Sequence, residues 1–285
     1  MRLITFSKNG KQTPGILRAD YNAIYPLDRL GYGSALEFIA AGEEAWTAAD
    51  SAAASAEARE LLPLASVQLL APLPRPGKIL CVGLNYRDHA VESAMELPKV
   101  PAVFTKFSNA IIGHGASVII PKMTQQPDYE AEMAIVIGKT CKRAAAADWK
   151  EYVFGYTILN DVSARDVQLS TSQWSLGKSF DTFAPMGPAI VGKDEIADPH
   201  ALDIKLSIGG ETLQHSNTRE LIFKAPDLIS YLSSIVTLEP GDVISTGTPS
   251  GVGLGRTPKR WILPGETMTI EIEGIGILTN PVIAG

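Results

Sequence analysis

The sequence contains only two cysteines, Cys81 and Cys141, which are too few for a disulfide framework. They do not form a CxxC pair, and each lies in or beside an apolar stretch, so we interpret both as structural thiols. A thiolate nucleophile at Cys81, eight residues before His89, is the weaker alternative, because nothing nearby in the sequence would lower its pKa.

Long apolar runs and basic clusters are also absent. No run approaches the roughly 18 residues that a membrane-spanning helix needs. The N-terminal stretch MRLITFSKNG becomes polar after six positions, unlike a secretory signal. A net charge of -6 and a pI near 5.3 would repel nucleic acid and anionic lipid. We therefore expect a cytoplasmic protein without nucleic-acid or membrane partners.

Several catalytic motifs are missing. The chain has no GxSxG and no HExxH, and His114, His200 and His215 show no metal-ligand spacing. The glycine-rich segment 245–255 follows a predicted strand but matches neither GxxxxGK[ST] nor GxGxxG. These absences argue against a serine hydrolase, a zinc protease and a nucleotide site. They favour a backbone-lined substrate loop in the glycine-rich segment.

The chain divides at a proline-rich segment. Of its 285 residues 45% are hydrophobic, which is enough for a sizeable core. Short alternating runs and an alanine-rich stretch at 34–62, which predicts a helix, come first. The segment 71–78, APLPRPGK, cannot continue a helix and predicts a linker. We place a small N-terminal domain at 1–72 and a larger domain at 73–285.

The larger domain is rich in predicted strands. Short runs of Val, Ile, Thr and Phe recur between Gly and Pro residues, which indicates a mainly β domain with antiparallel and mixed pairing. Two stretches, 85–97 and 225–238, instead have helical spacing. The predicted strands are 78–83, 102–107, 117–121, 132–138, 156–161, 189–192, 204–210, 242–247 and 268–274.

Three carboxylates stand near the ends of two predicted strands. Glu130 and Glu132 are two positions apart at the head of an apolar strand, so they point to the same face. Asp161 ends another run and could supply a third oxygen ligand. Singly, the first two could be an ordinary charged strand start, and Asp161 or Ser163 could cap the following turn. Together, three carboxylates need a divalent cation, and their oxygens suit a hard one.

Two further features could carry chemistry. His89 and Glu92 stand at i and i+3, so on a helix they share a face, which suits a general base that activates water. The alternative, an exposed helix pair, is the better interpretation on spacing alone. Lys178 lies among Gly, aromatic and Pro residues, and could bind a carboxylate or stabilise an enolate.

The chain resembles the fumarylacetoacetate hydrolase family, and in particular its bacterial-type acylpyruvate hydrolases and 2-hydroxyhepta-2,4-diene-1,7-dioate isomerases. The resemblance runs from Lys78 to Val282, and the first 70 residues fit only a looser N-terminal extension. It implies an α+β, mainly β fold: a mixed β-sheet roll around a central metal site, with a small N-terminal α/β extension, usually in a homodimer. The segments are GLNYRDHAVE, DYEAEMAIVIG, NDVSARDVQ, GKSFDTFAPMGP, STGTPSGVG and LPGETMTIEIEGIGILTNPV.

The resemblance also implies roles for single residues. His89 and Glu92 would be the water-activating dyad of a mobile lid, and members differ in lid length after Glu92, at 93–101. Lys178 would stabilise the enolate. The implied ligands of Mg²⁺ or Mn²⁺ are Glu130, Glu132 and Asp161. The residues implied to bind the 2-oxo acid end of the substrate are Arg165, Gln168, Lys178 and Thr248.

From this resemblance we predict a metal-dependent hydrolase of aromatic catabolism. It would cleave a carbon-carbon bond of a 2,4-diketo acid, an acylpyruvate such as fumarylpyruvate or maleylpyruvate, to pyruvate and a carboxylic acid. Alternatives are an oxaloacetate decarboxylase and an isomerase or decarboxylase of a hydroxymuconate-type acid. A keto-enol isomerase would need only the proton transfer. A non-catalytic dicarboxylate binder is a further alternative, which the pair His89 and Glu92 argues against.

Overall fold

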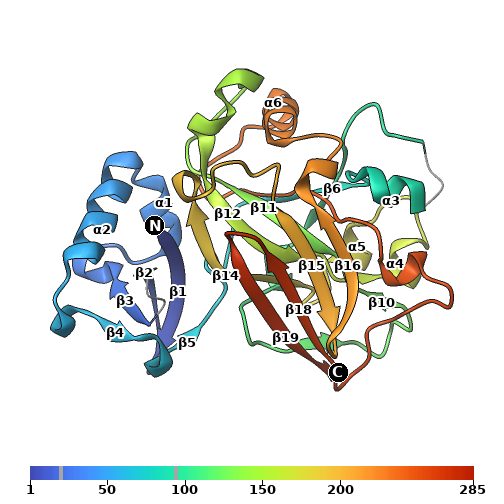
Figure 1. Cartoon of the computed structure of the whole chain (residues 1–285), viewed down its shortest axis with the longest axis horizontal. Coiled ribbons are helices and arrows are strands. Elements are labelled where there is room, and N and C mark those ends of the chain that lie inside the picture. The colour runs from blue at the N-terminus through green and yellow to red at the C-terminus, as the bar shows by residue number, and fades with distance from the viewer. Residues whose placement is uncertain (19–21, 93–95) are drawn as a thin grey trace.

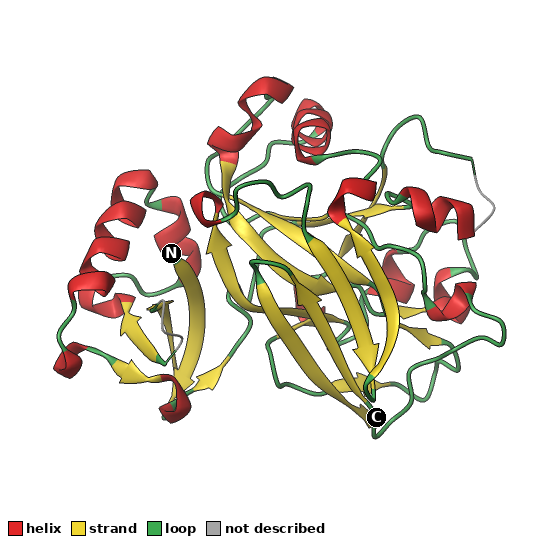
Figure 2. Cartoon of the chain, in the orientation of Figure 1, coloured by secondary structure: helices red, strands yellow, loops and turns green. Residues whose placement is uncertain are grey.

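The computed structural model describes residues 1–18, 22–92 and 96–285. Strands dominate it, and short helices lie at the periphery (Figures 1 and 2), which confirms the α+β, mainly β fold class. Among the described residues no helix is long and apolar enough to cross a membrane. The helices are α1 (Ala35–Ala40), α2 (Glu43–Ser55), α3 (Arg87–Glu92), α4 (Arg165–Gln168), α5 (Ser175–Lys178) and α6 (Ala225–Ile235).

Most strands belong to two sheets. The large one runs in the order β4-β3-β2-β1-β14-β12-β11-β17-β6-β7, and the second in the order β16-β15-β18-β19-β9. The strands are β1 (Arg2–Lys8), β2 (Lys11–Leu17), β3 (Ala23–Pro26), β4 (Leu62–Pro63), β5 (Gln68–Leu69), β6 (Ile79–Gly83), β7 (Ala102–Lys106), β8 (Ile111–Ile112), β9 (Val118–Ile120), β10 (Pro127–Asp128), β11 (Ala131–Ile137), β12 (Val153–Asn160), β13 (Ser163–Ala164), β14 (Ala184–Gly192), β15 (Asp203–Ile208), β16 (Glu211–Asn217), β17 (Val243–Ser245), β18 (Thr267–Ile272) and β19 (Gly276–Ala284).

The predicted strands are confirmed, and the helices in part. Each of the nine predicted runs contains a strand, whereas β16 and β19 were not predicted from periodicity. The stretch 225–238 forms α6, and 85–97 forms α3 only as far as Glu92. Residues 93–95 lie outside the described part of the chain, so the predicted variable lid segment is described only from Glu96 onward.

The alanine-rich stretch at 34–62 forms two helices instead of one long one. Ser34 caps α1, because its side chain accepts a hydrogen bond from the backbone N–H of Glu37 at 3.1 Å. Gly42 separates α1 from α2 at a φ of 88°, a left-handed conformation that favours glycine. The predicted single helix is therefore wrong at this glycine, and the chain turns there.

Both faces of β11 are buried, which explains its continuous apolar sequence. Met133, Ile135 and Ile137 pack in the core cluster that contains the second sheet. Ala134 and Val136 point the other way, into a cluster built with α1 and α2. The strand is thus held from both sides, and it carries the first carboxylates of the candidate site.

The predicted linker at 71–78 contains no helix or strand, but the sheet is shared across it. Strand β1 pairs antiparallel with β14, with Leu3 opposite Ile190. In Figure 1 the N-terminal strands lie beside β14 at one end of the molecule. The division at 72/73 stays a prediction.

Candidate active site

Strand register brings the carboxylates together. In the antiparallel pair of β11 and β12, Ala131 lies opposite Asn160. Glu130 precedes the first strand and Asp161 follows the second, and the backbone N–H of Asp161 donates to the carbonyl oxygen of Glu130 at 2.9 Å. Glu130 and Asp161, which are 31 positions apart in the sequence, therefore become neighbours through strand pairing. Glu132 points to the same face as Glu130, as the alternation of a strand requires.

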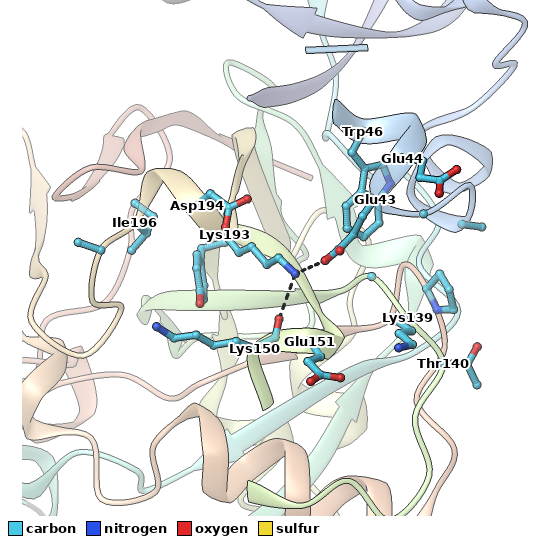
Figure 3. Close-up of a pocket in the computed structure, with 16 residues that line it drawn as sticks. Glu43, Glu44, Trp46, Lys139, Thr140, Lys150, Glu151, Lys193, Asp194 and Ile196 are labelled. Atoms are coloured by element: carbon cyan, nitrogen blue, oxygen red, sulfur yellow. Dashed lines mark hydrogen bonds and ion pairs between the residues drawn. The ribbon is translucent and has the colours of Figure 1, made fainter. Parts of the chain in front are cut away.

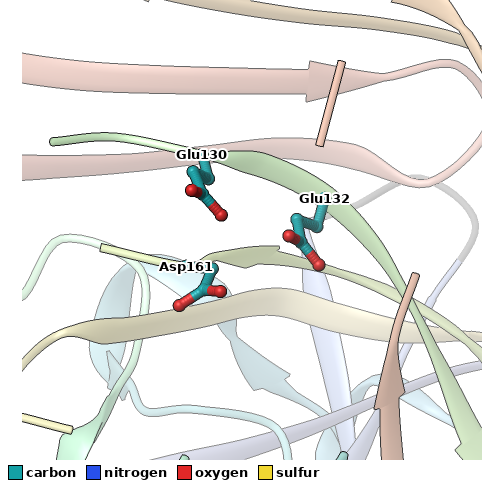
Figure 4. Close-up of side chains that lie close together, drawn as sticks. All are labelled: Glu130, Glu132 and Asp161. Atoms are coloured by element: carbon teal, nitrogen blue, oxygen red, sulfur yellow. The ribbon is translucent and has the colours of Figure 1, made fainter. Parts of the chain in front are cut away.

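Three buried carboxylates form one cluster. Each of Glu130, Glu132 and Asp161 offers an oxygen within 4.8 Å of those of the other two (Figure 4). The side chain of Asp161 is 0% exposed. Asp161 does not act as the helix cap that was its alternative interpretation, because α4 begins at Arg165 with Ala164 in the cap position. Like charges at this spacing need compensation by cations.

Two lysines supply part of this compensation. Lys178 Nζ lies 2.9 Å from a carboxylate oxygen of Glu130 and 2.9 Å from one of Asp161. Burial lowers the pKa of Lys178, but the charges of Asp161 and Glu130 outweigh burial and raise it overall. Lys106, at the end of β7, donates to the other oxygen of Asp161 at 2.6 Å and is fully buried. Asp161 is thus held between two ammonium groups.

Arg165 connects the cluster to the wall of the site. Its Nε lies 2.8 Å from a carboxylate oxygen of Asp128, and its Nη2 lies 2.7 Å from one of Glu130. The remaining Nη1 donates to Gln168 Oε1 at 2.9 Å. Burial opposes the charge of Arg165, yet Asp128 and Glu130 raise its pKa overall. The guanidinium therefore stays charged and fixed in direction.

Glu132 lacks such a cation among the described residues. Its carboxylate accepts hydrogen bonds from Ser245 Oγ at 2.5 Å and from the backbone N–H of Gly247 at 2.9 Å. Burial, reinforced by the charges of Asp161 and Glu130, raises the pKa of Glu132 to about 8. One carboxylate thus remains short of positive charge, and a divalent cation between the three oxygens would supply it. The residues present fit such an ion.

His89 and Glu92 form a pair on α3. The Nδ1 of His89 lies 3.1 Å from Oε2 of Glu92, while Oε1 accepts from the backbone N–H of Gly251 at 2.9 Å. Burial opposes ionisation of Glu92, but these two hydrogen bonds hold its pKa below the ordinary value. With Nδ1–H directed at a carboxylate, the lone pair of neutral His89 lies on Nε2.

One cavity of about 610 Å³ joins these groups. Phe104 and Trp174 form part of its apolar wall, with ring centroids 5.6 Å apart. Gly83 permits this wall, because a Cβ there would stand 2.6 Å from the Trp174 ring. Asp161 does not line the cavity, whereas Lys178, which contacts it, does. The predicted site residues that do line it are His89, Glu92, Glu130, Glu132, Arg165, Gln168, Lys178 and Thr248.

Comparison with known proteins decides the family. Residues 78–283 match the family described as "Fumarylacetoacetate (FAA) hydrolase C-terminal". The chain belongs to the fumarylacetoacetate hydrolase family. It is 47% identical over 249 residues, 87% of this chain and 79% of the relative, to "Oxaloacetate tautomerase Fahd2a, mitochondrial" of Rattus norvegicus.

Solved structures of this family superpose on the chain. The maleylpyruvate hydrolase from Sphingobium sp. SYK-6 in complex with manganese(II) ion and pyruvate has a TM-score of 0.83 and 31% identity, with all of both chains covered. The 2-hydroxyhepta-2,4-diene-1,7-dioate isomerase from Mycobacterium marinum has a TM-score of 0.78 and 34% identity, covering 100% of this chain and 98% of that one. Proteins similar to this chain are thus named as hydrolases, isomerases and tautomerases.

The expected cytoplasmic location is contradicted by the comparison. The rat relative is named as a mitochondrial protein. The expectation rested on the missing apolar run, which distinguishes only a secretory signal. Mitochondrial targeting segments are amphipathic and Arg-rich instead of continuously apolar, so that argument could not separate the two compartments.

Sequence patterns did not reveal three buried groups that support the site. Lys106 ends a strand like many exposed lysines, and only the fold places it against Asp161. Asp128 accepts from the backbone N–H groups of Gly253 and Leu254 and pairs with Arg165. Gln214 of β16 donates at 2.8 Å to Thr248 Oγ1 and fixes its position. Asp128 could have been found from the sequence, because it is an acidic residue only two positions before Glu130. No sequence signal marked Gln214.

A larger hollow of about 1250 Å³ lies between the N-terminal helices and the rest of the chain (Figure 3). Lys193 and Glu43 meet in it at 2.5 Å. None of the three clustered carboxylates lines it. The smaller cavity is therefore the candidate active site, because it is lined by the acid–base pair and by two of the clustered carboxylates, Glu130 and Glu132.

Neither cysteine belongs to the chemistry. Cys81 and Cys141 are both buried and free. Burial raises the pKa of each thiol, and for Cys81 the charges of Asp161 and Glu132 raise it further. A thiolate is disfavoured at both positions, so the interpretation as structural thiols agrees with the structure.

Proposed function

We propose that this protein is a divalent-metal-dependent enzyme that moves a proton at the carbon next to the 2-oxo group of a small acid, and that it acts as an oxaloacetate keto-enol tautomerase. One observation carries the proposal: the pair His89 and Glu92 lines the same cavity as Glu130 and Glu132, two of the three clustered carboxylates. The name of the rat relative supports oxaloacetate as the substrate.

His89 is the proposed general base. Glu92 accepts a hydrogen bond from Nδ1 and leaves Nε2 to take the proton from carbon 3 of the acid and to return it to the enol oxygen or to carbon 3. The Gly251 N–H fixes the other oxygen of Glu92, so the imidazole keeps one orientation. Gln168 and Thr248 line the cavity and would hold the carboxylate end of the acid.

Glu130, Glu132 and Asp161 would hold the cation, Mg²⁺ or Mn²⁺. When bound, such a cation stabilises the negative charge that develops on the 2-oxo oxygen during enolisation. The manganese complex of the maleylpyruvate hydrolase supports this ion class. Lys178, beside two of the three carboxylates, adds fixed positive charge next to the cation position.

Hydrolysis of an acylpyruvate is the second candidate. It uses the same base, but His89 would take the proton of a water that attacks the distal carbonyl. Two observations favour it: the cavity extends along the apolar wall of Phe104 and Trp174, and a relative is a maleylpyruvate hydrolase. The wall offers space for an acyl chain that oxaloacetate lacks.

The deciding experiment compares both reactions in one preparation. Decay of the ultraviolet absorbance of enol-oxaloacetate measures tautomerisation, and pyruvate release from maleylpyruvate and fumarylpyruvate measures hydrolysis. Each assay is run with Mn²⁺, with Mg²⁺ and with EDTA, against metal-only blanks. We expect metal-dependent enol decay above the blank. Pyruvate release from an acylpyruvate without enhanced enol decay would replace the tautomerase by the hydrolase. The absence of both activities would refute the proposal.

A further inference from the structure

The loop after β17 carries three cations with different surroundings. Arg256 donates to two backbone carbonyl oxygens, and Arg260 pairs with Glu266. Lys259 is exposed and lines the active-site cavity, where its Nζ donates to the carbonyl oxygen of Leu254. In the part of the chain that the structure describes, Lys259 forms no ion pair with a carboxylate. Its charge therefore faces the cavity without an acidic partner.

The other fixed cations of the cavity are already paired. Arg165 contacts Asp128 and Glu130, and Lys178 contacts Glu130 and Asp161, all with buried partners. A substrate carboxylate that took either cation for itself would leave a buried carboxylate uncompensated, which is costly. Lys259 can accept an anionic group without that cost, because only a backbone carbonyl oxygen competes for it.

The loop places Lys259 on a wall next to the reacting groups. The backbone N–H of Leu254 donates to Asp128 at 3.0 Å, the same carboxylate that fixes Arg165. Gly255 lies against Glu92, since a Cβ on this glycine would stand 2.5 Å from the carboxyl carbon. Residues 254 and 255 of the loop thus lie between Asp128, which pairs with Arg165, and Glu92 of the acid–base pair. Lys259 comes four residues later in the same loop.

We infer that Lys259 binds a second, distal carboxylate of the substrate, so that the enzyme selects dicarboxylic over monocarboxylic 2-oxo acids of equal length. The inference rests on the proposed function, because it takes the 2-oxo acid end to lie at the carboxylate cluster. Glu96 also lines the cavity and repels a second carboxylate, so it opposes this preference. In a partly open cavity an ammonium–carboxylate bond gives a preference of about tenfold.

Equilibrium binding to the Mn²⁺-loaded protein tests the inference without turnover. Isothermal titration calorimetry compares 2-oxoglutarate with 2-oxopentanoate and 2-oxoadipate with 2-oxohexanoate, which differ in the distal carboxylate. Variants are Lys259→Met, which removes the charge, and Lys259→Arg, which keeps it. Lys205→Met is the matched control, because Lys205 is exposed on β15 and does not line the cavity.

The measured quantity is the ratio of the two dissociation constants within each pair. We expect the unaltered protein to favour the dicarboxylate about tenfold in at least one pair. Lys259→Met should abolish this preference, Lys259→Arg should keep most of it, and Lys205→Met should leave it unchanged. No preference in the unaltered protein, or the same preference in Lys259→Met, would overturn the inference while leaving the proposed function intact. Failure to bind any of the four acids would overturn both.

Discussion

At the scale of single residues, the site depends on a balance of buried charges. Asp128 and the three clustered carboxylates carry four negative charges when ionised, against three positive charges on Lys106, Lys178 and Arg165. The imbalance falls on Glu132, whose pKa is raised to about 8. A divalent cation would turn the deficit into an excess of one positive charge, which suits an anionic substrate.

Replacing His89 by Asn should lower kcat of the metal-loaded enzyme by about 10² to 10⁴-fold, the usual contribution of a general base. The dissociation constant for Mn²⁺ should stay the same, because His89 contacts Glu92 and none of the clustered carboxylates. Enol decay and manganese titration measure the two quantities. His215→Asn, at an exposed position on β16, is the control. If His89→Asn kept its activity, His89 would not be the general base.

At the scale of elements, one loop orients catalytic-site side chains that a strand and a helix position. The glycine-rich loop after β17 directs the N–H of Gly247 at Glu132 and that of Gly251 at Glu92. Two carboxylates with different roles are thus oriented by one short segment. The backbone-lined substrate loop stays a prediction, because these N–H groups bond to carboxylates of the protein.

Gly255→Ala tests this coupling between the loop and α3. The new methyl group would stand 2.5 Å from the carboxyl carbon of Glu92, so the carboxylate must leave His89. We expect kcat to fall at least about tenfold, with a melting temperature within about 2 °C of the unaltered protein, because the glycine is exposed. Gly33→Ala, where the new methyl group faces Glu37 far from α3 in the sequence, should leave both unchanged.

The N-terminus of α6 should make stability depend on pH. The backbone N–H of Ala225 donates to Nε2 of His200, whose Nδ1 lies 3.2 Å from Asp198. Burial lowers the pKa of His200, and the nearby charges of Asp198, Lys224 and Asp227 adjust it in both directions. The unfolded chain therefore binds more protons, so stability is present above the unfolded pKa near 6.5 and is lost as pH falls through the lower folded pKa.

Chemical denaturation between pH 7.5 and pH 5, roughly the range around the histidine pKa, measures this dependence. His200→Asn keeps a hydrogen-bond acceptor but cannot be protonated, so its free energy of unfolding should fall less steeply with decreasing pH. His114, whose pKa burial also lowers, contributes in the same direction and stays in both proteins. An unchanged slope in His200→Asn would show that this histidine is not the titrating group.

At the scale of the whole molecule, the cation should act as part of the fold. An ion at 100 times its dissociation constant adds about 2.7 kcal/mol to the stability of the native state, or about 5–10 °C in melting temperature. EDTA should reverse this gain. Glu132→Gln should abolish it without lowering the melting temperature of the metal-free protein, because it removes a carboxylate that burial disfavours. Glu271→Gln, on the exposed side of β18, is the control in the same thermal scans.

The homodimer implied by the family resemblance stays a prediction. Phe107 and Ile119 are 49% and 38% exposed, and both their backbone N–H groups bond to side chains of the segment 179–182, so they lie on one face. An apolar face of this kind suits contact with a second copy. Light scattering after size exclusion should give twice the chain mass of 30.5 kDa, and Ile119→Glu should shift it toward the monomer.

The sequence alone predicted nine of the strands, and it proposed the candidate site residues. An apolar run such as that of β11 is visible in the sequence because the strand is buried on both faces, which favours apolar residues at successive positions. The roles proposed for Glu130, Glu132, Asp161, His89 and Glu92 come from the family resemblance, because the motifs that carry it can be read from the sequence.

Only the tertiary structure decided what compensates and orients those residues. Lys106 and Gln214 contact the site residues Asp161 and Thr248 through side-chain hydrogen bonds between distant segments, and nothing in their own segments distinguishes them from surface residues. The pairing of β1 with β14 likewise joins segments that lie far apart in the sequence. Long-range charge compensation is a property of the folded arrangement, because a charge that is buried far along the chain finds its partner only when the fold buries both together.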